Sequence, residues 1–195
     1  MEKILEKGKE MIIILVGELA SGKTTLAKSL TKAGYKRIVT YTTRPQRKGE
    51  VHGKDYYFLS DEEFDDYVDR GIFAETAEYN TVEGIWRYGS SKFSYVTPDD
   101  SVIILNPIGV KKILEIDDIK KNRKNLMIAY LDYPEEIRTE RALKRGDSPE
   151  EITRRIIQDK PIFQDFVNSK EYDYRLKNDA AAANFYLLAK AMKTR

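Results

Sequence analysis

The chain has 195 residues and a formal net charge of +2, from 34 basic and 32 acidic side chains. This length suits one well-packed domain with an insertion, and the near-neutral balance gives no bulk sign of a nucleic-acid binder. The absence of cysteine excludes disulfides, thiolate catalysis and cysteine zinc sites. The longest apolar run is far below the roughly 18 residues that a membrane helix needs. We therefore expect a cytoplasmic protein with no nucleic-acid or membrane partner.

The first ten residues, MEKILEKGKE, contain acidic residues interrupted by lysines. They resemble neither a secretory signal nor a transit peptide. We expect them to form a frayed or short helical extension.

The segment MIIILVGELASGKTTLA, residues 11–27, has the order of a phosphate-binding loop. A short apolar strand meets Gly17, four residues follow, and Gly22-Lys23-Thr24 opens a helix-like pattern. Glycines allow backbone N–H groups to surround an anion, the helix start adds its positive dipole end, and Lys23 reaches the outer phosphates. The Thr24 hydroxyl is expected to meet Mg²⁺. The predicted ATP-binding residues are Gly17, Glu18, Leu19, Ala20, Ser21, Gly22, Lys23, Thr24 and Thr25.

Downstream of the loop, a helix is predicted over residues 24–33 and ends at Gly34. Residues 36–41 are predicted to form a strand. The next four residues leave regular structure, because the residue before Pro45 is pushed toward extended conformations.

Residues 42–97 interrupt the alternation of strands and helices and predict an inserted lobe. Ser60 and Glu63 form a capping box at the start of a helix that ends at Gly71. The strands expected in this lobe cover residues 56–59, 72–79 and 85–88, the last two joined by a turn around Glu83-Gly84.

The alternation returns after Pro98 and predicts a parallel sheet with helices on both faces. Strands are expected over residues 102–105, 126–131 and 174–176. Helices are expected over residues 107–116, 134–145, 150–166 and 179–192.

Arg44 and Arg47 flank a proline turn and are suited to binding one phosphate. A guanidinium group presents two parallel N–H donors that match two phosphate oxygens better than an ammonium group does. The alternative is that both arginines are solvated on the surface. Considered without the surrounding sequence, the two residues favour this alternative.

The longer segment YTTRPQRKGEVHGKDYYFL, residues 41–59, together with the phosphate loop resembles the guanylate kinase family. The resemblance extends from Met11 to the last helix. It implies a P-loop kinase with a core (residues 11–39 and 98–195), a GMP-binding lobe (residues 40–97) and a helical lid (about residues 141–160). It also implies that Tyr56 and Tyr88 donate hydroxyls to the phosphate that Arg44 and Arg47 bind.

The resemblance also implies how the base is read. Guanine presents two adjacent donors that one carboxylate can accept together, whereas adenine would leave that carboxylate facing an acceptor. Glu75 falls where the family has its guanine-reading glutamate. Ser90 and Thr40, the latter where the family usually has serine, are implied as hydroxyls for the O6 atom.

The sequence departs from the family pattern in three places. The family usually has two aspartates, two residues apart, where this chain has Ile104 and Asn106. Asn106 keeps an oxygen acceptor but loses the charge that contributes to base and magnesium surroundings. Glu18, Leu19 and Ala20 replace the usual proline, serine and glycine, and residues 80–87 are longer than the usual turn.

Arginines near residue 146 suit a lid that closes over the transferred phosphoryl group. Arg141 and Arg145 are one helical turn apart, and Arg154 and Arg155 follow on the next helix. Such cations stabilise the charge that spreads over three phosphoryl oxygens. The resemblance implies Arg141, Arg145 and Arg155 as catalytic lid residues beside Lys23.

The sequence therefore predicts a kinase that uses ATP and Mg²⁺ to phosphorylate GMP or dGMP, as a monomer or homodimer. Two alternatives remain open. One is a nucleoside-monophosphate kinase with a different or broadened acceptor, which Asn106 and the longer edge suggest. The other is a non-catalytic guanylate-kinase-like module that holds a phosphopeptide. The retained Gly22-Lys23-Thr24 disfavours this second alternative.

Overall fold

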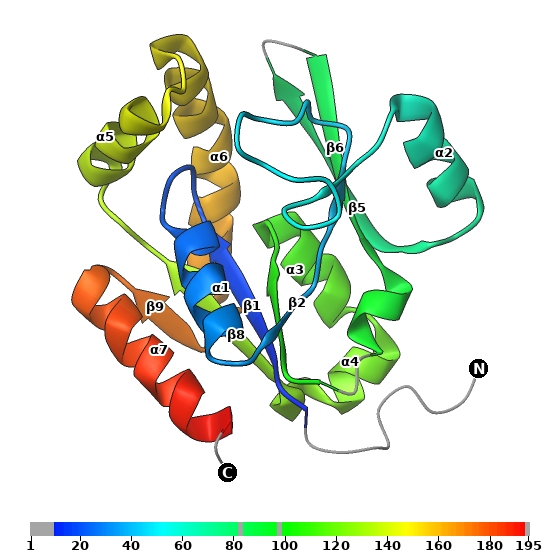
Figure 1. Cartoon of the computed structure of the whole chain (residues 1–195), viewed down its shortest axis with the longest axis vertical. Helices are drawn as coiled ribbons and strands as arrows, with labels where there is room; N and C mark the ends of the chain where they lie inside the picture. The colour runs from blue at the N-terminus through cyan, green and yellow to red at the C-terminus, as the bar shows by residue number, and fades with distance from the viewer. Residues whose placement is uncertain (1–9, 82–83, 97–98, 194–195) are drawn as a thin grey trace.

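The computed structural model describes residues 10–81, 84–96 and 99–193 (Figure 1). The extension predicted for the first ten residues lies, apart from Glu10, outside the described residues, and so does Glu83 of the predicted hairpin turn. Within these described ranges, none of the helices combines the length and apolar character that crossing a membrane requires.

A parallel five-stranded sheet forms the centre of the molecule, with strand order β2-β7-β1-β8-β9. Strand β1 lies in the middle, and all six of its residues are buried. Because the strands are parallel, their carboxyl ends meet at one edge, where Gly17 pairs in register with Leu131. The strands are β1 (Ile12–Gly17), β2 (Lys36–Arg37), β7 (Ser101–Ile104), β8 (Leu126–Leu131) and β9 (Tyr174–Leu176).

Helices cover both faces of this sheet (Figure 1). Alternate residues of a strand point to opposite faces. Accordingly, Ile13 and Leu15 pack with α1 (Lys23–Lys32) and α7 (Asp179–Lys193). Ile12, Ile14 and Val16 instead join residues of three helices, α3 (Pro107–Leu114), α4 (Asp117–Lys121) and α6 (Pro149–Ser169). The predicted parallel sheet with helices on both faces is confirmed, although α4 was not predicted.

A second, mixed sheet has the strand order β4-β3-β6-β5. Helix α2 (Asp61–Asp69) begins with the predicted capping box, in which the Ser60 and Glu63 side chains each accept a hydrogen bond from the other's backbone N–H. Arg87 binds α2 to β6 through Asp61 and Asp65. The strands are β3 (Tyr41–Thr42), β4 (Tyr57–Phe58), β5 (Phe73–Thr81) and β6 (Gly84–Ser91).

The predicted single strand over residues 36–41 is wrong. The Ile38 N–H still pairs with the Val102 carbonyl of the central sheet, at 2.9 Å, whereas the Thr40 carbonyl accepts from Tyr57 of the second sheet, also at 2.9 Å. The chain thus leaves one sheet for the other within three residues, and the strand divides into β2 and β3. Two short 3₁₀ segments, η1 (Lys92–Tyr95) and η2 (Arg123–Asn125), were not predicted either.

The phosphate loop is anchored on α6 and on α5 (Glu135–Arg145). Leu19 is buried with Ala142 and Ile152, and Ala20 packs against the same small cluster. The Glu18 carboxylate pairs with Arg138 at 3.2 Å, with little of either side chain exposed. All three residues that depart from the family loop pattern therefore contact, or pack with, the helices that follow β8.

We expect Arg138→Met to lower the free energy of unfolding by about 3 kcal/mol near neutral pH, because it leaves the Glu18 charge buried without a partner. Burial raises the pKa of Glu18 and Arg138 lowers it, so the variant raises this pKa further. A raised folded-state pKa costs stability as pH rises through it, so the loss should be small near pH 4 and full near pH 8.

Urea unfolding across this pH range measures the effect. Arg70→Met removes an exposed ion pair with Asp66 and is the matched control, expected to leave the free energy of unfolding nearly unchanged. Adding Glu18→Gln to Arg138→Met should restore most of the loss. An equal loss at every pH would contradict a role for the Glu18 charge.

Candidate active site

The phosphate loop joins the carboxyl end of β1 to the start of α1. Gly17 is required sterically, because a Cβ there would lie 2.4 Å from Ser21 Oγ and 2.9 Å from the Leu131 carbonyl. Gly22 has a φ of +94°, in the left-handed region. Ala20 has a φ of +54°, so it keeps the glycine-like conformation at a cost of roughly 1 kcal/mol.

Lys23 occupies the inside of this loop. Its Nζ donates to the carbonyls of Gly17, at 2.6 Å, and Glu18, at 2.7 Å, and lies 3.4 Å from Ser21 Oγ. Burial and the neighbouring Arg155 lower the pKa of Lys23 to about 7, with a further lowering by Arg145. An anion bound at the loop would favour the charged form, so anion binding and protonation of Lys23 reinforce each other.

The three arginines expected in the lid lie around this loop, each with an acidic partner. Arg141 Nη1 lies 3.8 Å from where a Cβ of Gly22 would be, and its Nη2 pairs with Asp179. Arg145 and Arg155 both act on the charge of Lys23. The partners of Arg145 and Arg155 are Asp147 and Asp159, the latter at 3.4 Å.

Glu50 binds the guanidinium of Arg44 and the backbone of Arg47, the two arginines expected at the acceptor phosphate. Its carboxylate accepts two hydrogen bonds from Arg44 Nη2, at 2.8 and 2.9 Å, and one from the Arg47 backbone N–H at 2.9 Å. Burial and the nearby charges of Arg44 and Arg145 lower the pKa of Arg47. The effect of Arg44 and Arg145 on Arg47 indicates that positive charge from residues 44–47 and from α5 lies in one region.

Tyr56 and Tyr88, the two predicted hydroxyl donors, lie beside these arginines. Their ring centroids are 6.2 Å apart in an edge-to-face arrangement, and the Arg44 guanidinium lies over the Tyr56 ring at 5.5 Å. Burial and Tyr88 raise the pKa of Tyr56, which therefore stays a hydrogen-bond donor. Tyr79, which the sequence did not single out, packs edge-to-face on Tyr88 at 5.7 Å.

Glu75 ends a buried chain of polar groups. Its Oε1 accepts from Ser90 Oγ at 2.7 Å, and Ser90 Oγ also lies 2.8 Å from the Tyr95 hydroxyl. Its Oε2 is buried without a hydrogen-bond partner and lies 3.0 Å from where a Cβ of Gly109 would be. Burial raises the pKa of Glu75. An orphaned carboxylate oxygen is costly, and a ligand that donates to it would remove this cost.

The two positions where the family usually has aspartates differ in environment. Asn106 caps α3, because its Oδ1 accepts from the Gly109 N–H at 2.7 Å. Ile104 instead packs against the hydrophobic core beneath α1 and α7. Thr40, the third residue expected at the base, is buried where the chain crosses between the sheets.

Thr24 is compatible with the expected Mg²⁺. It is exposed at the start of α1, where its hydroxyl is free to meet a cation carried by a nucleotide. Among the described residues, no three His, Cys, Asp or Glu side chains gather into a metal cage. This donor set fits a magnesium ion held mainly by nucleotide phosphates.

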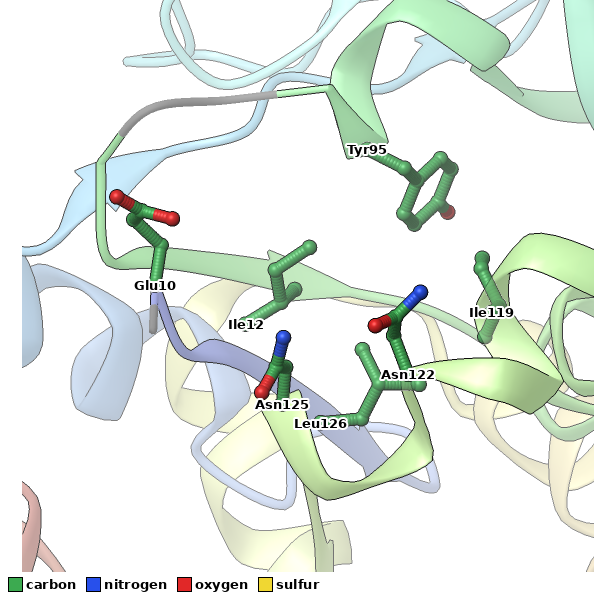
Figure 2. A pocket seen from close by; sticks show the side chains of 7 residues that line it. All are labelled: Glu10, Ile12, Tyr95, Ile119, Asn122, Asn125 and Leu126. Atoms are coloured by element: carbon green, nitrogen blue, oxygen red, sulfur yellow. The ribbon is translucent and has the colours of Figure 1, made fainter. Parts of the chain in front are cut away.

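The structure also has two hollows besides this site, the first of which shares Tyr95 with it. Figure 2 shows the residues around a small cavity, which include Ile12, Tyr95 and Leu126. Its volume is about 20 Å³, which is large enough for about one water molecule. Ile12 and Leu126 begin β1 and β8, so this cavity is at the amino end of the sheet, opposite the phosphate loop. A larger groove of about 570 Å³ is lined by segments that include Tyr41 and Phe93. Neither hollow is lined by a predicted site residue.

Several residues at the site escaped the sequence reading. Glu50 belongs to the quoted family segment, and Asp159 follows Arg155 by one helical turn, so both carried a usable signal. Arg138 carried no such signal, because its ion pair is with Glu18, which is distant in the sequence. Tyr95 carried none either, because it lies in an unpredicted 3₁₀ turn and acts through a hydrogen bond to Ser90.

Comparison with known proteins agrees with this geometry. The family model described as guanylate kinase matches residues 9–195. A guanylate kinase from Clostridium tetani is 33% identical over 183 residues, covering 90% of this chain and 80% of that protein. A guanylate kinase from Geobacter metallireducens is 35% identical over 182 residues, covering 89% and 83%.

A crystal structure of guanylate kinase from Anaplasma phagocytophilum has a TM-score of 0.64 and 26% sequence identity to this chain, covering 95% of this chain and 87% of that one. The family model spans nearly the whole chain, and the relatives match over most of their own length. The chain belongs to the guanylate kinase family.

Proposed function

We propose that the chain transfers the γ-phosphoryl group of ATP to GMP or dGMP, forming GDP or dGDP. The observation that carries this proposal is the buried carboxylate of Glu75, which has one oxygen bound to Ser90 and the other without a partner. Guanine offers two adjacent donors, N1–H and the 2-amino group, that suit such a carboxylate. The base would lie between β5, β6 and the start of α3.

The donor phosphates bind in the loop of residues 17–25 in this proposal. Lys23 exchanges the carbonyls of Gly17 and Glu18 for phosphate oxygens, and the start of α1 adds its dipole. The acceptor phosphate is bound by Arg44, Arg47, Tyr56 and Tyr88. Arg141, Arg145 and Arg155 stabilise the charge that develops during transfer.

No general base is required, because the acceptor oxygen belongs to a phosphate that is already ionised near neutral pH. The work of the protein is to align two nucleotides and to exclude water between them. Mg²⁺ would supply charge neutralisation on the donor phosphates, and the Thr24 hydroxyl is the protein group that would hold it. A cytoplasmic location and a monomeric or homodimeric state stay predictions.

Lys23→Met should lower kcat about a hundredfold or more, because it removes the cation that meets the donor phosphates. Coupled measurement of ADP release with GMP as acceptor gives this value. Lys28→Met, on an exposed position of α1, is the matched control and should keep normal turnover. Near-normal kcat in Lys23→Met, with the fold intact by circular dichroism, would refute the assignment of the loop.

Glu75→Gln should lower kcat/KM for GMP by roughly ten- to a hundredfold, the usual range for losing hydrogen bonds to a charged group. Activity with AMP should fall less, since the amide can donate to adenine. Steady-state kinetics with a panel of GMP, dGMP, IMP, AMP and pyrimidine monophosphates measures both effects. Glu78→Gln, an exposed position on the same strand, is the control.

In the wild type, the panel should rank GMP and dGMP above IMP, which lacks the 2-amino donor, and IMP above AMP. If another acceptor turned over and GMP did not, the broadened-acceptor alternative would replace this proposal. If no acceptor turned over while ATP still bound, the binding-module alternative would gain support.

A further inference from the structure

The hydroxyl of Tyr95 is a buried polar group to which the proposed reaction assigns no role. Tyr95 is the last residue of the 3₁₀ segment η1 and is 4% exposed. Its ring belongs to the hydrophobic cluster that includes Ile12 and Leu126, and it borders the small cavity of Figure 2. Phenylalanine has the same ring, so packing alone does not require the hydroxyl.

The Tyr95 hydroxyl completes a chain of hydrogen bonds whose direction follows from counting protons. Ser90 Oγ lies 2.7 Å from Glu75 Oε1 and 2.8 Å from the Tyr95 hydroxyl oxygen. An ionised carboxylate only accepts hydrogen bonds, and a serine hydroxyl has a single proton to donate. The proton of Ser90 therefore goes to Glu75, and Tyr95 must donate its own proton to Ser90.

Burial strengthens this chain. Ser90 has no exposed surface, and Glu75 and Tyr95 are nearly as buried, so all three side chains are shielded from bulk water. Burial also raises the pKa of Tyr95, so the phenol keeps the proton that it donates. Hydrogen bonds in series polarise one another in such surroundings, so the Tyr95 proton strengthens the bond from Ser90 to Glu75.

The chain also determines which oxygen of Glu75 is available to a ligand. Ser90 stands opposite Glu75 in the register of β6 and β5, and it binds Oε1. The other oxygen, Oε2, is buried without a partner and lies 3.0 Å from where a Cβ of Gly109 would be. A firm bond to Oε1 restricts rotation of the carboxylate and so keeps Oε2 directed toward the start of α3.

We propose that Tyr95 is a positioning residue for base recognition, which holds Ser90 as a donor to Glu75 and so directs the free oxygen of Glu75 toward the guanine base. Because its only proton goes to Glu75, Ser90 acts on the base through that carboxylate and does not donate to the O6 atom. The effect on the base rests on the proposed function. The direction of the hydrogen bonds is a property of the free protein.

The test is Tyr95→Phe, which removes the hydroxyl and keeps the ring. KM for GMP should rise about three- to tenfold, the usual cost of one hydrogen bond, because the carboxylate is held less firmly. Both kcat and KM for ATP should stay within about twofold, since the phosphate-binding groups are unchanged. Tyr35→Phe is the matched control, because it removes a buried hydroxyl that donates to the Ala189 carbonyl at 2.9 Å. This control should leave KM for GMP unchanged.

A double-mutant cycle with Ser90→Ala separates this role from a packing effect. Because Tyr95 acts through Ser90, Tyr95→Phe should change KM for GMP by less than about 1.5-fold once Ser90 is alanine. An equal rise in both backgrounds would overturn the proposal. So would an unchanged KM for GMP in Tyr95→Phe, or a rise that KM for ATP shares.

NMR of the ligand-free wild type, with ¹³C-labelled tyrosine, tests the hydrogen bond without a variant or a nucleotide. The hydroxyl proton of Tyr95 should exchange slowly with water, as that of Tyr35 should, and should show a nuclear Overhauser effect to the Ser90 side chain. Rapid exchange, or the lack of this effect, would overturn the proposal.

Failure of the proposed function gives a different result. A wild type that shows the Tyr95 hydrogen bond but does not phosphorylate GMP would refute the proposed function, and with it the link to the base. A wild type that phosphorylates GMP with the same KM as Tyr95→Phe would refute the role of Tyr95 alone.

Discussion

The mutual repulsion of cations gathered at the carboxyl edge of the central sheet is the constraint on which the site depends. Like charges a few ångströms apart in a partly desolvated region disfavour one another strongly. The chain offsets this repulsion by giving five of the arginine side chains a carboxylate on a nearby or distant segment. The pairs are Arg44–Glu50, Arg138–Glu18, Arg141–Asp179, Arg145–Asp147 and Arg155–Asp159.

These pairs do more than neutralise charge, because they join segments. Arg138–Glu18 fastens α5 to the phosphate loop, and Arg141–Asp179 links α5 to the start of α7. Contacts with α5 and α6 also explain how the loop accommodates the unusual residues Glu18, Leu19 and Ala20. Packing of Leu19 and Ala20 under α5 and α6 offsets the backbone cost of a left-handed alanine.

The periodicity of apolar residues was enough to predict the central sheet and its covering helices. A strand buried on both faces needs a continuous apolar run, and the run Ile12–Val16 is such a strand, so its composition was enough to predict it. The division of residues 36–41 could not be predicted, since it depends on Ile38 and Thr40 pairing with different sheets. Local propensity contains no information on such partners.

The residues of the candidate site likewise fall into those that the sequence predicted and those that it did not. The residues of the quoted motifs, such as Arg44 and Lys23, were predicted because spacing along the chain carries them. The hydrogen-bond chain from Tyr95 through Ser90 to Glu75 was not, because it closes only when β5, β6 and η1 pack together. Acidic partners distant in sequence, such as Asp179, were hidden for the same reason.

The unpartnered oxygen of Glu75 has a consequence for the evolution of this protein. A buried acceptor without a donor lowers the stability of the empty enzyme, and a neutral side chain at position 75 would remove that burden. Selection for thermal stability alone would therefore eliminate this carboxylate. Its persistence would have to come from selection on the bound state, so under the proposed function the demands of folding and of base recognition are opposed at position 75.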